Sequence, residues 1–280
     1  MYPISVISDE FKLGNSIESF EAICKLLQTM DVHFIDLRKI LGKKPIELSQ
    51  QEIQQIKAMC SQNHLKIGCI NSNLFKGPMS EISEKKQEFK EKIIKYFEIC
   101  KEFDTKILRV FPFRAPKNYK ESDPIPKEII SFYLEISDMA KPYGVILCSE
   151  NENNLYANSP KHMLEFIEAT QRENIRLLID PGNIFRHKPN FPVDRMDELY
   201  KFSAYSHLKD VAKNIFGGRY HIPVGDGFVG FKVMLQKMKN AGYSSLFAIE
   251  THMAKNKYEN TIRSLKNLYQ ILKDLNWTLN

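Results

Sequence analysis

The sequence predicts an α/β protein that folds as a single (β/α)8 TIM barrel over residues 1–280. Short β-rich runs alternate with longer stretches of helical periodicity along the whole chain, a pattern typical of parallel strands joined by crossover helices. Eight such units fill 280 residues, which suits a closed barrel better than an open doubly wound sheet. The open sheet is also disfavoured because no glycine-rich phosphate loop follows the first strand. No linker or low-complexity tract divides the chain.

The first half of the chain supplies four of these units. The predicted strands are residues 4–8, 33–37, 65–70 and 105–111. The predicted helices are residues 16–30, 49–63, about 80–103 and about 126–142. Lys141, Pro142 and Gly144 supply the stop that ends the fourth helix.

The second half repeats the alternation. The predicted strands are residues 145–150, 175–180, 204–209 and 246–250. The predicted helices are residues 159–171, about 194–200, 230–242 and about 256–275. Ser159 suits the N-cap of the fifth helix, with Pro160 at its first position. Loops are expected between the sixth strand and Asp194, and between the seventh strand and its helix.

Composition indicates a globular protein of the cytoplasm. Hydrophobic residues make up 43% of the chain and charged residues 26%, with no apolar run of transmembrane length and no secretory signal pattern at the N-terminus. The five cysteines lack CxxC spacing, which favours buried free thiols in a reducing compartment. The net charge of +6 comes from lysines spread over helices and by itself identifies no partner. We expect neither a nucleic-acid nor a membrane partner. Exposed aromatic residues on helix faces leave a homo-oligomer open.

Polar residues follow the predicted strands, at the end of a barrel where function resides. The strand ends carry Asp9, Glu10, Asp36, Arg38, Asn71, Arg109, Glu150, Asn151, Asp180, Asn183, His207, Lys209 and Glu250. The last four strands each supply one residue of a type that binds metal, namely Glu150, Asp180, His207 and Glu250. Strand alternation places His207 on one face with Lys209.

If these faces point into the barrel mouth, three carboxylates and one imidazole converge there. Without a cation, the carboxylates would repel one another and some would stay protonated. A divalent metal removes that difficulty, and this set of ligands suits manganese, magnesium, zinc or cobalt without choosing among them. Taken singly, each acid also fits a helix N-cap or a loop salt bridge, and the histidine a structural hydrogen bond. Spacing alone leaves both interpretations open.

Several motifs then resemble one known group of proteins. They are "SDEF", "FIDLRKILGKKPIELS", "LKIGCINSNLF", "SENENN", "LLIDPGNIF", "SHLKD", "IPVGDG" and "AIETH". In this order they resemble the sugar phosphate isomerase/epimerase group of the xylose isomerase-like TIM barrel superfamily. Each motif alone is weak, whereas the ordered set covers nearly the whole chain.

The resemblance implies one divalent metal ion held by Glu150, Asp180, His207 and Glu250. In the ketose epimerases of the superfamily the two glutamates are also the acid/base pair, which implies catalytic roles for Glu150 and Glu250. The substrate would be a small carbohydrate: a sugar, a sugar phosphate or a related polyol. The metal would polarise its carbonyl and stabilise an enediolate, while the two carboxylates move the proton.

Four further residues are expected to bind substrate. Asn183 stands where relatives often carry a histidine, and it can donate a hydrogen bond but cannot shuttle a proton. Lys209 could hold a substrate oxygen or phosphate, or form a salt bridge to a neighbouring carboxylate. Arg109 and His221 are candidates for binding an anionic substrate. The role of Glu152 stays open.

Three alternatives accompany this hypothesis. An inosose-type dehydratase would use the same metal and base, and the ligand set does not separate it from an isomerase. An endonuclease IV-like DNA repair enzyme needs additional histidines for three zinc ions, where this chain has Asp36, Asn71 and Asn183. A non-catalytic binding barrel is disfavoured because the ligand set is complete. Substrate specificity is expected to lie in loops 75–80, 113–126 and 212–222, whose sequences do not identify a particular sugar.

Overall fold

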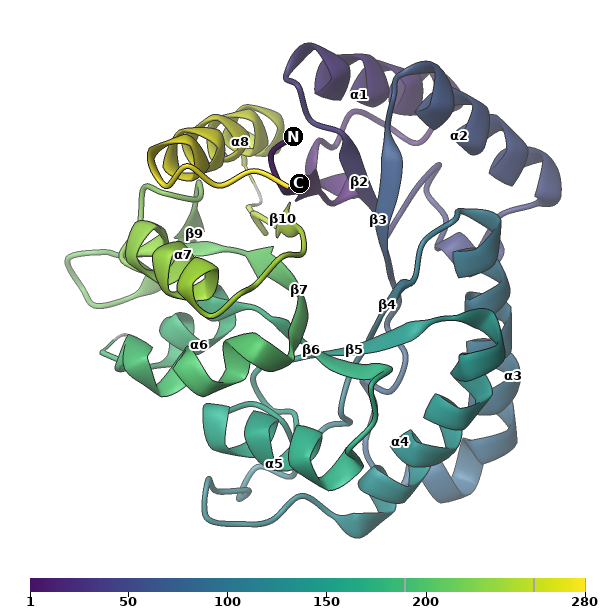
Figure 1. The fold of residues 1–280 in the computed structure, drawn as a ribbon, viewed down its shortest axis with the longest axis vertical. Coiled ribbons are helices and arrows are strands. Elements are labelled where there is room, and N and C mark those ends of the chain that lie inside the picture. The colour runs from purple at the N-terminus through teal and green to yellow at the C-terminus, as the bar shows by residue number, and fades with distance from the viewer. Residues whose placement is uncertain (189, 254, 280) are drawn as a thin grey trace.

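The computed structural model describes residues 1–188, 190–253 and 255–279, and eight parallel strands roll into a nearly closed barrel at its centre (Figure 1). The strands are β1 (Ile4–Val6), β2 (Phe34–Leu37), β3 (Lys66–Asn71), β4 (Ile107–Val110), β5 (Ile146–Glu150), β6 (Ile175–Ile179), β7 (Ser203–Leu208) and β10 (Phe247–Ile249). Their order is β1-β10-β7-β6-β5-β4-β3-β2. A parallel bridge between Ile7 and Asp36 joins the two ends of this sheet. The predicted fold class is therefore confirmed.

Helices lie around the outside of the barrel (Figure 1). They are α1 (Ile17–Thr29), α2 (Gln50–Gln62), α3 (Glu81–Glu102), α4 (Lys127–Ala140), α5 (Pro160–Thr170), α6 (Pro181–His187), α7 (Phe231–Asn240) and α8 (Lys257–Asp274). Short 3-10 helices span Ser8–Glu10, Pro45–Glu47, Lys141–Tyr143 and Val193–Phe202. Side-chain caps explain several starts: Ser49 and Glu52 form a capping box at α2, and Ser159 caps α5 as predicted. Among the described helices, none combines the length and apolar composition that a bilayer crossing requires.

Two segments after strands differ from the prediction. The segment after β6 was expected to be a loop, yet α6 starts there at Pro181, because proline suits a first helical position and Asp180 caps the helix by accepting a hydrogen bond from the Asn183 amide at 3.2 Å. The expected loop after β7 instead contains an antiparallel hairpin of β8 (Asp210–Lys213) and β9 (Arg219–Ile222). Both differences add structure at the end of the barrel where the polar strand ends gather.

Apolar packing fixes the barrel in two layers. The smaller one fills the barrel interior and consists of Ile7, Cys69, Cys148, Leu178, Tyr205, Leu246 and Ala248. The larger one lies between strands and helices and includes an aromatic cluster in which Phe75 packs against Phe89, Phe113 and Phe132 with ring centroids 5.0–5.4 Å apart. All five cysteines are free and buried. A packed interior holds the strand ends rigidly, and this rigidity positions the site described next.

Candidate metal centre

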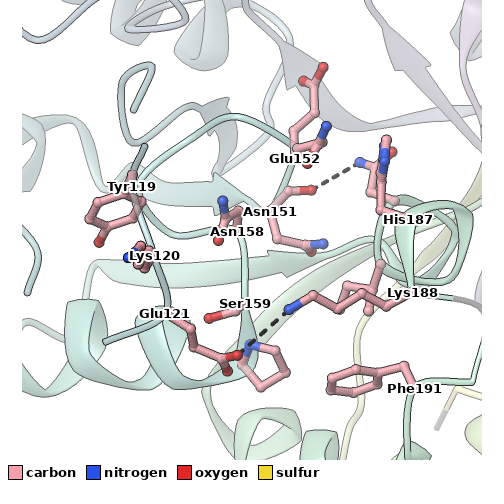
Figure 2. Close-up of a pocket in the computed structure, with 14 residues that line it drawn as sticks. Tyr119, Lys120, Glu121, Asn151, Glu152, Asn158, Ser159, His187, Lys188 and Phe191 are labelled. Carbon is pink, nitrogen blue, oxygen red and sulfur yellow. Dashed lines mark hydrogen bonds and ion pairs between the residues drawn. The ribbon is translucent and has the colours of Figure 1, made fainter. Parts of the chain in front are cut away.

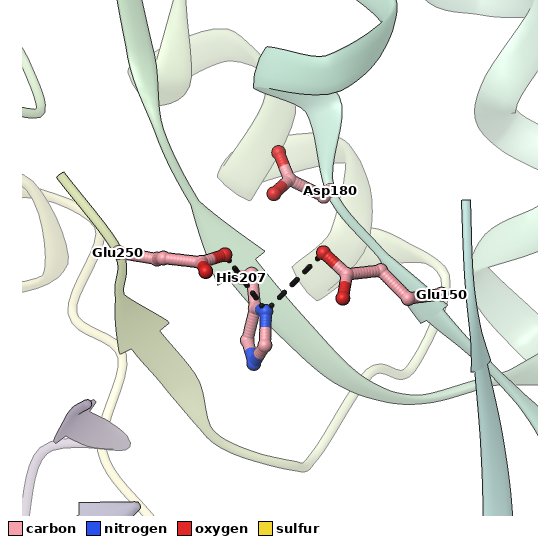
Figure 3. A group of neighbouring side chains, drawn as sticks. All are labelled: Glu150, Asp180, His207 and Glu250. Carbon is pink, nitrogen blue, oxygen red and sulfur yellow. Dashed lines mark ion pairs between the residues drawn. The ribbon is translucent and has the colours of Figure 1, made fainter. Parts of the chain in front are cut away.

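Four side chains from neighbouring strands point toward one another at the end of the barrel (Figure 3). Glu150 ends β5, Asp180 follows β6, His207 lies in β7 and Glu250 follows β10. One ligand atom from each lies within 4.8 Å of the other three, and every side chain is almost completely buried. The structure therefore brings together all four residues that the sequence placed in a metal site.

Buried polar atoms without a hydrogen bond face the space between these side chains. The Nδ1 atom of His207 lies 3.1 Å from Oε2 of Glu250 and 3.5 Å from Oε1 of Glu150. His207 Nδ1, Asp180 Oδ2 and Glu250 Oε2 are buried and make no hydrogen bond. Buried polar atoms without a hydrogen bond are costly, and carboxylate oxygens together with one imidazole nitrogen are ligands that suit a divalent cation. The residues present therefore fit a metal ion, whose identity they do not determine.

Each glutamate is held by an arginine on its outer oxygen. Arg109 Nη1 donates to Oε2 of Glu150 at 3.1 Å, and Arg38 Nη1 donates to Oε1 of Glu250. The other oxygen of each glutamate is left facing the convergence point. Arg38 also pairs with Asp9 at 2.9 Å and with the buried Glu10 at 2.7 Å.

Charge pairing sets the protonation of the four side chains. Burial acts to raise the pKa of Glu150, but Arg109 and Lys209 outweigh it and lower the pKa to about 2. The pKa of Glu250 likewise lies well below its usual value, against the effect of burial, because Lys209 and other cations face it. Burial raises the pKa of Asp180 to about 6. For His207, burial acts to lower the pKa, but Glu150 and Glu250 raise it to about 9.

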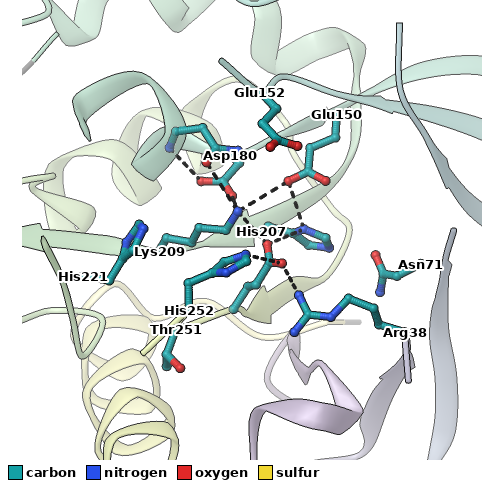
Figure 4. A network of polar contacts seen from close by, with 12 residues as sticks. Arg38, Asn71, Glu150, Glu152, Asp180, His207, Lys209, His221, Thr251 and His252 are labelled. Carbon is teal, nitrogen blue, oxygen red and sulfur yellow. Dashed lines mark hydrogen bonds and ion pairs between the residues drawn. The ribbon is translucent and has the colours of Figure 1, made fainter. Parts of the chain in front are cut away.

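Lys209 enters this group from the end of β7. Its ammonium lies 2.8 Å from Oδ2 of Asp180, 2.8 Å from Oε2 of Glu250 and 3.7 Å from Oε1 of Glu150. These are close ion pairs without hydrogen-bond geometry. The structure thus shows Lys209 in the salt-bridge arrangement, the second of the two roles considered for it. Figure 4 shows the side chain reaching toward Asp180 and Glu150.

A buried carboxylate lies behind the imidazole of His207 without a hydrogen bond to it. Asp36 lies beneath the site, fully buried, with its Oδ2 atom 4.0 Å from His207 Nε2. Asp36 accepts hydrogen bonds from Ser5 and Tyr205, both at 2.5 Å. A buried carboxylate behind a metal-binding histidine commonly orients the ring.

A cavity of 290 Å³ opens above the cluster and is rich in cationic side chains. The predicted substrate-binding residues Asn183, Lys209, Arg109 and His221 all line it. Arg38, Lys76, Arg186 and His252 line it too. The sequence places Arg38 at a strand end and Lys76 in an expected specificity loop without giving either residue a role, and it singles out neither Arg186 nor His252. These residues follow the last residues of the predicted strands or lie in a helix that was predicted as a loop. Strand alternation therefore could not indicate which way their side chains point.

Two side-chain contacts at this cavity determine which of its charged groups are free to bind a ligand. Arg186 Nη1 lies 2.6 Å from Nε2 of His221, and burial lowers the pKa of His221 to about 4, so this histidine is a neutral acceptor. Lys76 Nζ lies 2.6 Å from a carboxylate oxygen of Glu152. Arg186 is therefore the cavity arginine that contacts no carboxylate within the described chain.

A smaller cavity of 190 Å³ adjoins the first and shares Glu152 and Asn183 with it. Figure 2 shows Tyr119 and Phe191 on opposite sides of it, with Asn151 and Asn158 nearby. Aromatic rings and side-chain amides together suit a polyhydroxylated ligand. The position of Glu152 between the two cavities is a result that the sequence had left open.

Comparison with known proteins gives consistent results. The family model described as xylose isomerase-like TIM barrel matches residues 12–269. An inosose isomerase of Halalkalibacterium halodurans is 23% identical over 223 residues, which cover 78% of this chain and 77% of that protein. A crystal structure of the IOLI protein with a bound zinc atom superposes with a TM-score of 0.80 at 16% identity, covering 98% of this chain and 99% of that one. A xylose isomerase-like TIM barrel protein of Mycobacterium smegmatis in complex with magnesium gives a TM-score of 0.77 at 16% identity, with 98% of both chains covered.

Proposed function

This chain belongs to the xylose isomerase-like TIM barrel family, and we propose that it is a divalent-metal-dependent isomerase or epimerase. Its substrate is a sugar, a sugar phosphate or a related polyol. The observation that carries the proposal is the convergence of four buried side chains at the barrel end, whose facing atoms make no hydrogen bond. The inosose isomerase relative supports a function of the sugar isomerase kind.

Glu150, Asp180, His207 and Glu250 would hold one ion of manganese, zinc, magnesium or cobalt. When bound, such an ion supplies Lewis-acid polarisation of a substrate carbonyl. His207 would bind it through Nδ1, the nitrogen that faces the carboxylates.

Glu150 and Glu250 are the proposed proton-transfer groups. Both are held as carboxylates, so either can accept the proton from the carbon beside a carbonyl. In an isomerisation, the glutamate that has accepted the proton can return it to the neighbouring carbon. In an epimerisation, the second glutamate would act as the acid: it would deliver a proton to the opposite face of the enediolate, and the first glutamate would keep the proton that it removed. Their arginine contacts fix the outer oxygens, and the inner oxygens would face the metal ion and the substrate bound beside it.

The cavity residues are proposed to bind hydroxyl and anionic groups of the substrate. Arg109 is largely occupied by Glu150, so its main task is to orient that carboxylate. Arg186 and the neutral His221 lie together at the cavity and are better placed for a phosphate or carboxylate. The adjoining cavity near Asn183 offers room for substituents distant from the reacting carbons.

The residues of the site are compatible with one of the alternative functions and disfavour another. An inosose-type dehydratase would use the same four ligands and the same base, with loss of a hydroxyl in place of reprotonation. Three metal ions would need more ligands than the single group found in the described chain, and Asp36 is already bonded to Ser5 and Tyr205. Nucleic acid is therefore not the proposed substrate. Free, buried cysteines fit the proposed cytoplasmic location.

Hydrogen exchange with solvent tests this function. Metal-reconstituted protein is incubated in D2O with a panel of ketoses, aldoses, inososes and their phosphates, and deuterium beside the carbonyl is followed by NMR. We expect exchange on at least one substrate, lost in Glu250→Gln. Glu152→Gln, which changes an acid of the same cavity outside the ligand set, should keep its metal and still catalyse exchange at saturating substrate, whatever the change in KM. A dehydrated product would assign the dehydratase reaction. No exchange across the panel by a metal-loaded protein would refute the proposal.

A further inference from the structure

The ammonium group of Lys209 lies at the point where the proposed metal ligands converge. It contacts Asp180 and Glu250 at 2.8 Å each and Glu150 at 3.7 Å. The same atoms, Asp180 Oδ2 and Glu250 Oε2, are among the buried side-chain atoms that make no hydrogen bond. Lys209 itself is 4% exposed, so solvent does not weaken these contacts.

An ammonium and a divalent cation cannot both use these oxygens at such distances. Two cations bound to the same carboxylate oxygens would stand only a few ångströms apart, where like charges repel strongly in a poorly solvated site. Arg38 and Arg109 already contact the outer oxygens of the two glutamates. Lys209 is therefore the cation that has to move when the site takes up a metal.

The surroundings of Lys209 offer its ammonium another position. The side chain lines the 290 Å³ cavity, and the carbonyl oxygen of the Asn183 side chain lies 3.4 Å from Nζ. Glu152 lines the same cavity. A small rotation about the flexible lysine side chain thus leads from the carboxylates toward the space assigned to substrate.

We propose that Lys209 is the internal counter-ion of the metal-free centre, that it competes with the divalent ion for Asp180 and Glu250, and that it turns into the cavity to bind a substrate oxygen once displaced. The inference rests on the metal-binding part of the proposed function. It adds a coupling: the lysine becomes available to substrate only in a loaded site, and the carboxylates stay compensated when the site holds no metal.

Metal affinity of a Lys209→Met variant tests the competition. We expect metal-stripped variant protein to bind Zn²⁺ about tenfold more tightly than wild type, or better, because the competing charge is gone. The affinity is measured by competition with a chromophoric chelator and repeated calorimetrically with Mn²⁺. Lys76→Met is the matched control: it removes a lysine of the same cavity that pairs with Glu152, and its affinity should stay within about twofold of wild type. An unchanged or weaker affinity for Lys209→Met would mean that Lys209 organises the ligands, and would overturn the inference.

Chemical labelling of the wild-type protein decides the question even if the variant does not fold. Acetylation of Lys209, followed by mass spectrometry of its peptide, should be slow in the metal-stripped protein and at least about threefold faster after loading with Zn²⁺, because the ammonium leaves its three carboxylates. Equal or slower labelling after loading would refute the displacement. If wild-type protein binds neither Zn²⁺ nor Mn²⁺, the proposed function fails as well. Metal binding without displacement would contradict only the role given to Lys209.

Discussion

Metal binding near neutral pH is expected to release about one proton per chain. The imidazole of His207 must be neutral to bind a metal through Nδ1. In the metal-free protein, however, Glu150 and Glu250 overcome the effect of burial and raise the pKa of this imidazole to about 9. The proton that those carboxylates stabilise therefore has to leave when the metal binds.

The magnitude follows from two side chains. With a pKa of about 9, His207 is about 99% protonated at pH 7, and Asp180, with a pKa of about 6, is protonated in roughly one molecule in ten. Together they release about 1.1 protons. Because both pKa values are raised, the two ligands hold protons in the neutral pH range and compete there with the metal, increasingly so as the pH falls. As the pH falls from 8 to 7, the dissociation constant of the metal should rise about tenfold. It should rise more steeply below about pH 6, where Asp180 also takes up a proton.

Isothermal titration calorimetry measures this release directly. The metal-stripped protein is titrated at about pH 7 in two buffers that differ in ionisation enthalpy and do not bind the metal, and the difference in apparent enthalpy gives the number of protons. The affinity is then followed between about pH 6 and pH 8. Binding without proton release, with an affinity that stays flat over this range, would refute the account of His207.

Three further predictions concern the surroundings of the site. Asp36→Asn should weaken metal binding about tenfold in a chelator competition if the carboxylate, 4.0 Å from His207 Nε2, orients the ring of the metal-bound histidine; an unchanged affinity would contradict that role. Gly182→Ala should also weaken metal binding while leaving the circular dichroism spectrum native, because the added Cβ would lie 2.3 Å from the carbonyl oxygen of Lys209, and wild-type affinity would show that this contact is unimportant. Phe132→Ala should lower the free energy of unfolding in denaturant by about 3–5 kcal/mol with the metal content unchanged, and a loss below about 1 kcal/mol would show that the aromatic cluster repacks.

The sequence was sufficient to predict the barrel and the convergence of its strand ends. Each strand is an apolar run bounded by polar residues, and parallel strands bring their carboxyl ends to one side. Glu150, Asp180, His207 and Glu250 could be selected together for that reason, although their roles in metal binding and catalysis stay predictions.

Other parts of the site depend on geometry that strand periodicity does not encode. The dipeptide Pro181-Gly182 was interpreted as part of a loop, although it begins α6, and Arg186 was missed with that helix. The hairpin after β7 places His221 at the cavity, but alternation within a short loop segment did not predict the pairing of β8 with β9. Arg38 was noted at a strand end, yet only the structure shows that its guanidinium turns toward Glu250.

The metal content of the purified protein tests the central claim most directly. Inductively coupled plasma mass spectrometry should find about one divalent ion per chain in the wild-type protein and less than about a tenth of that in Glu250→Gln, with Glu152→Gln matching wild type. A wild-type protein that carries no divalent ion, and takes none up after dialysis against manganese or zinc, would contradict the account.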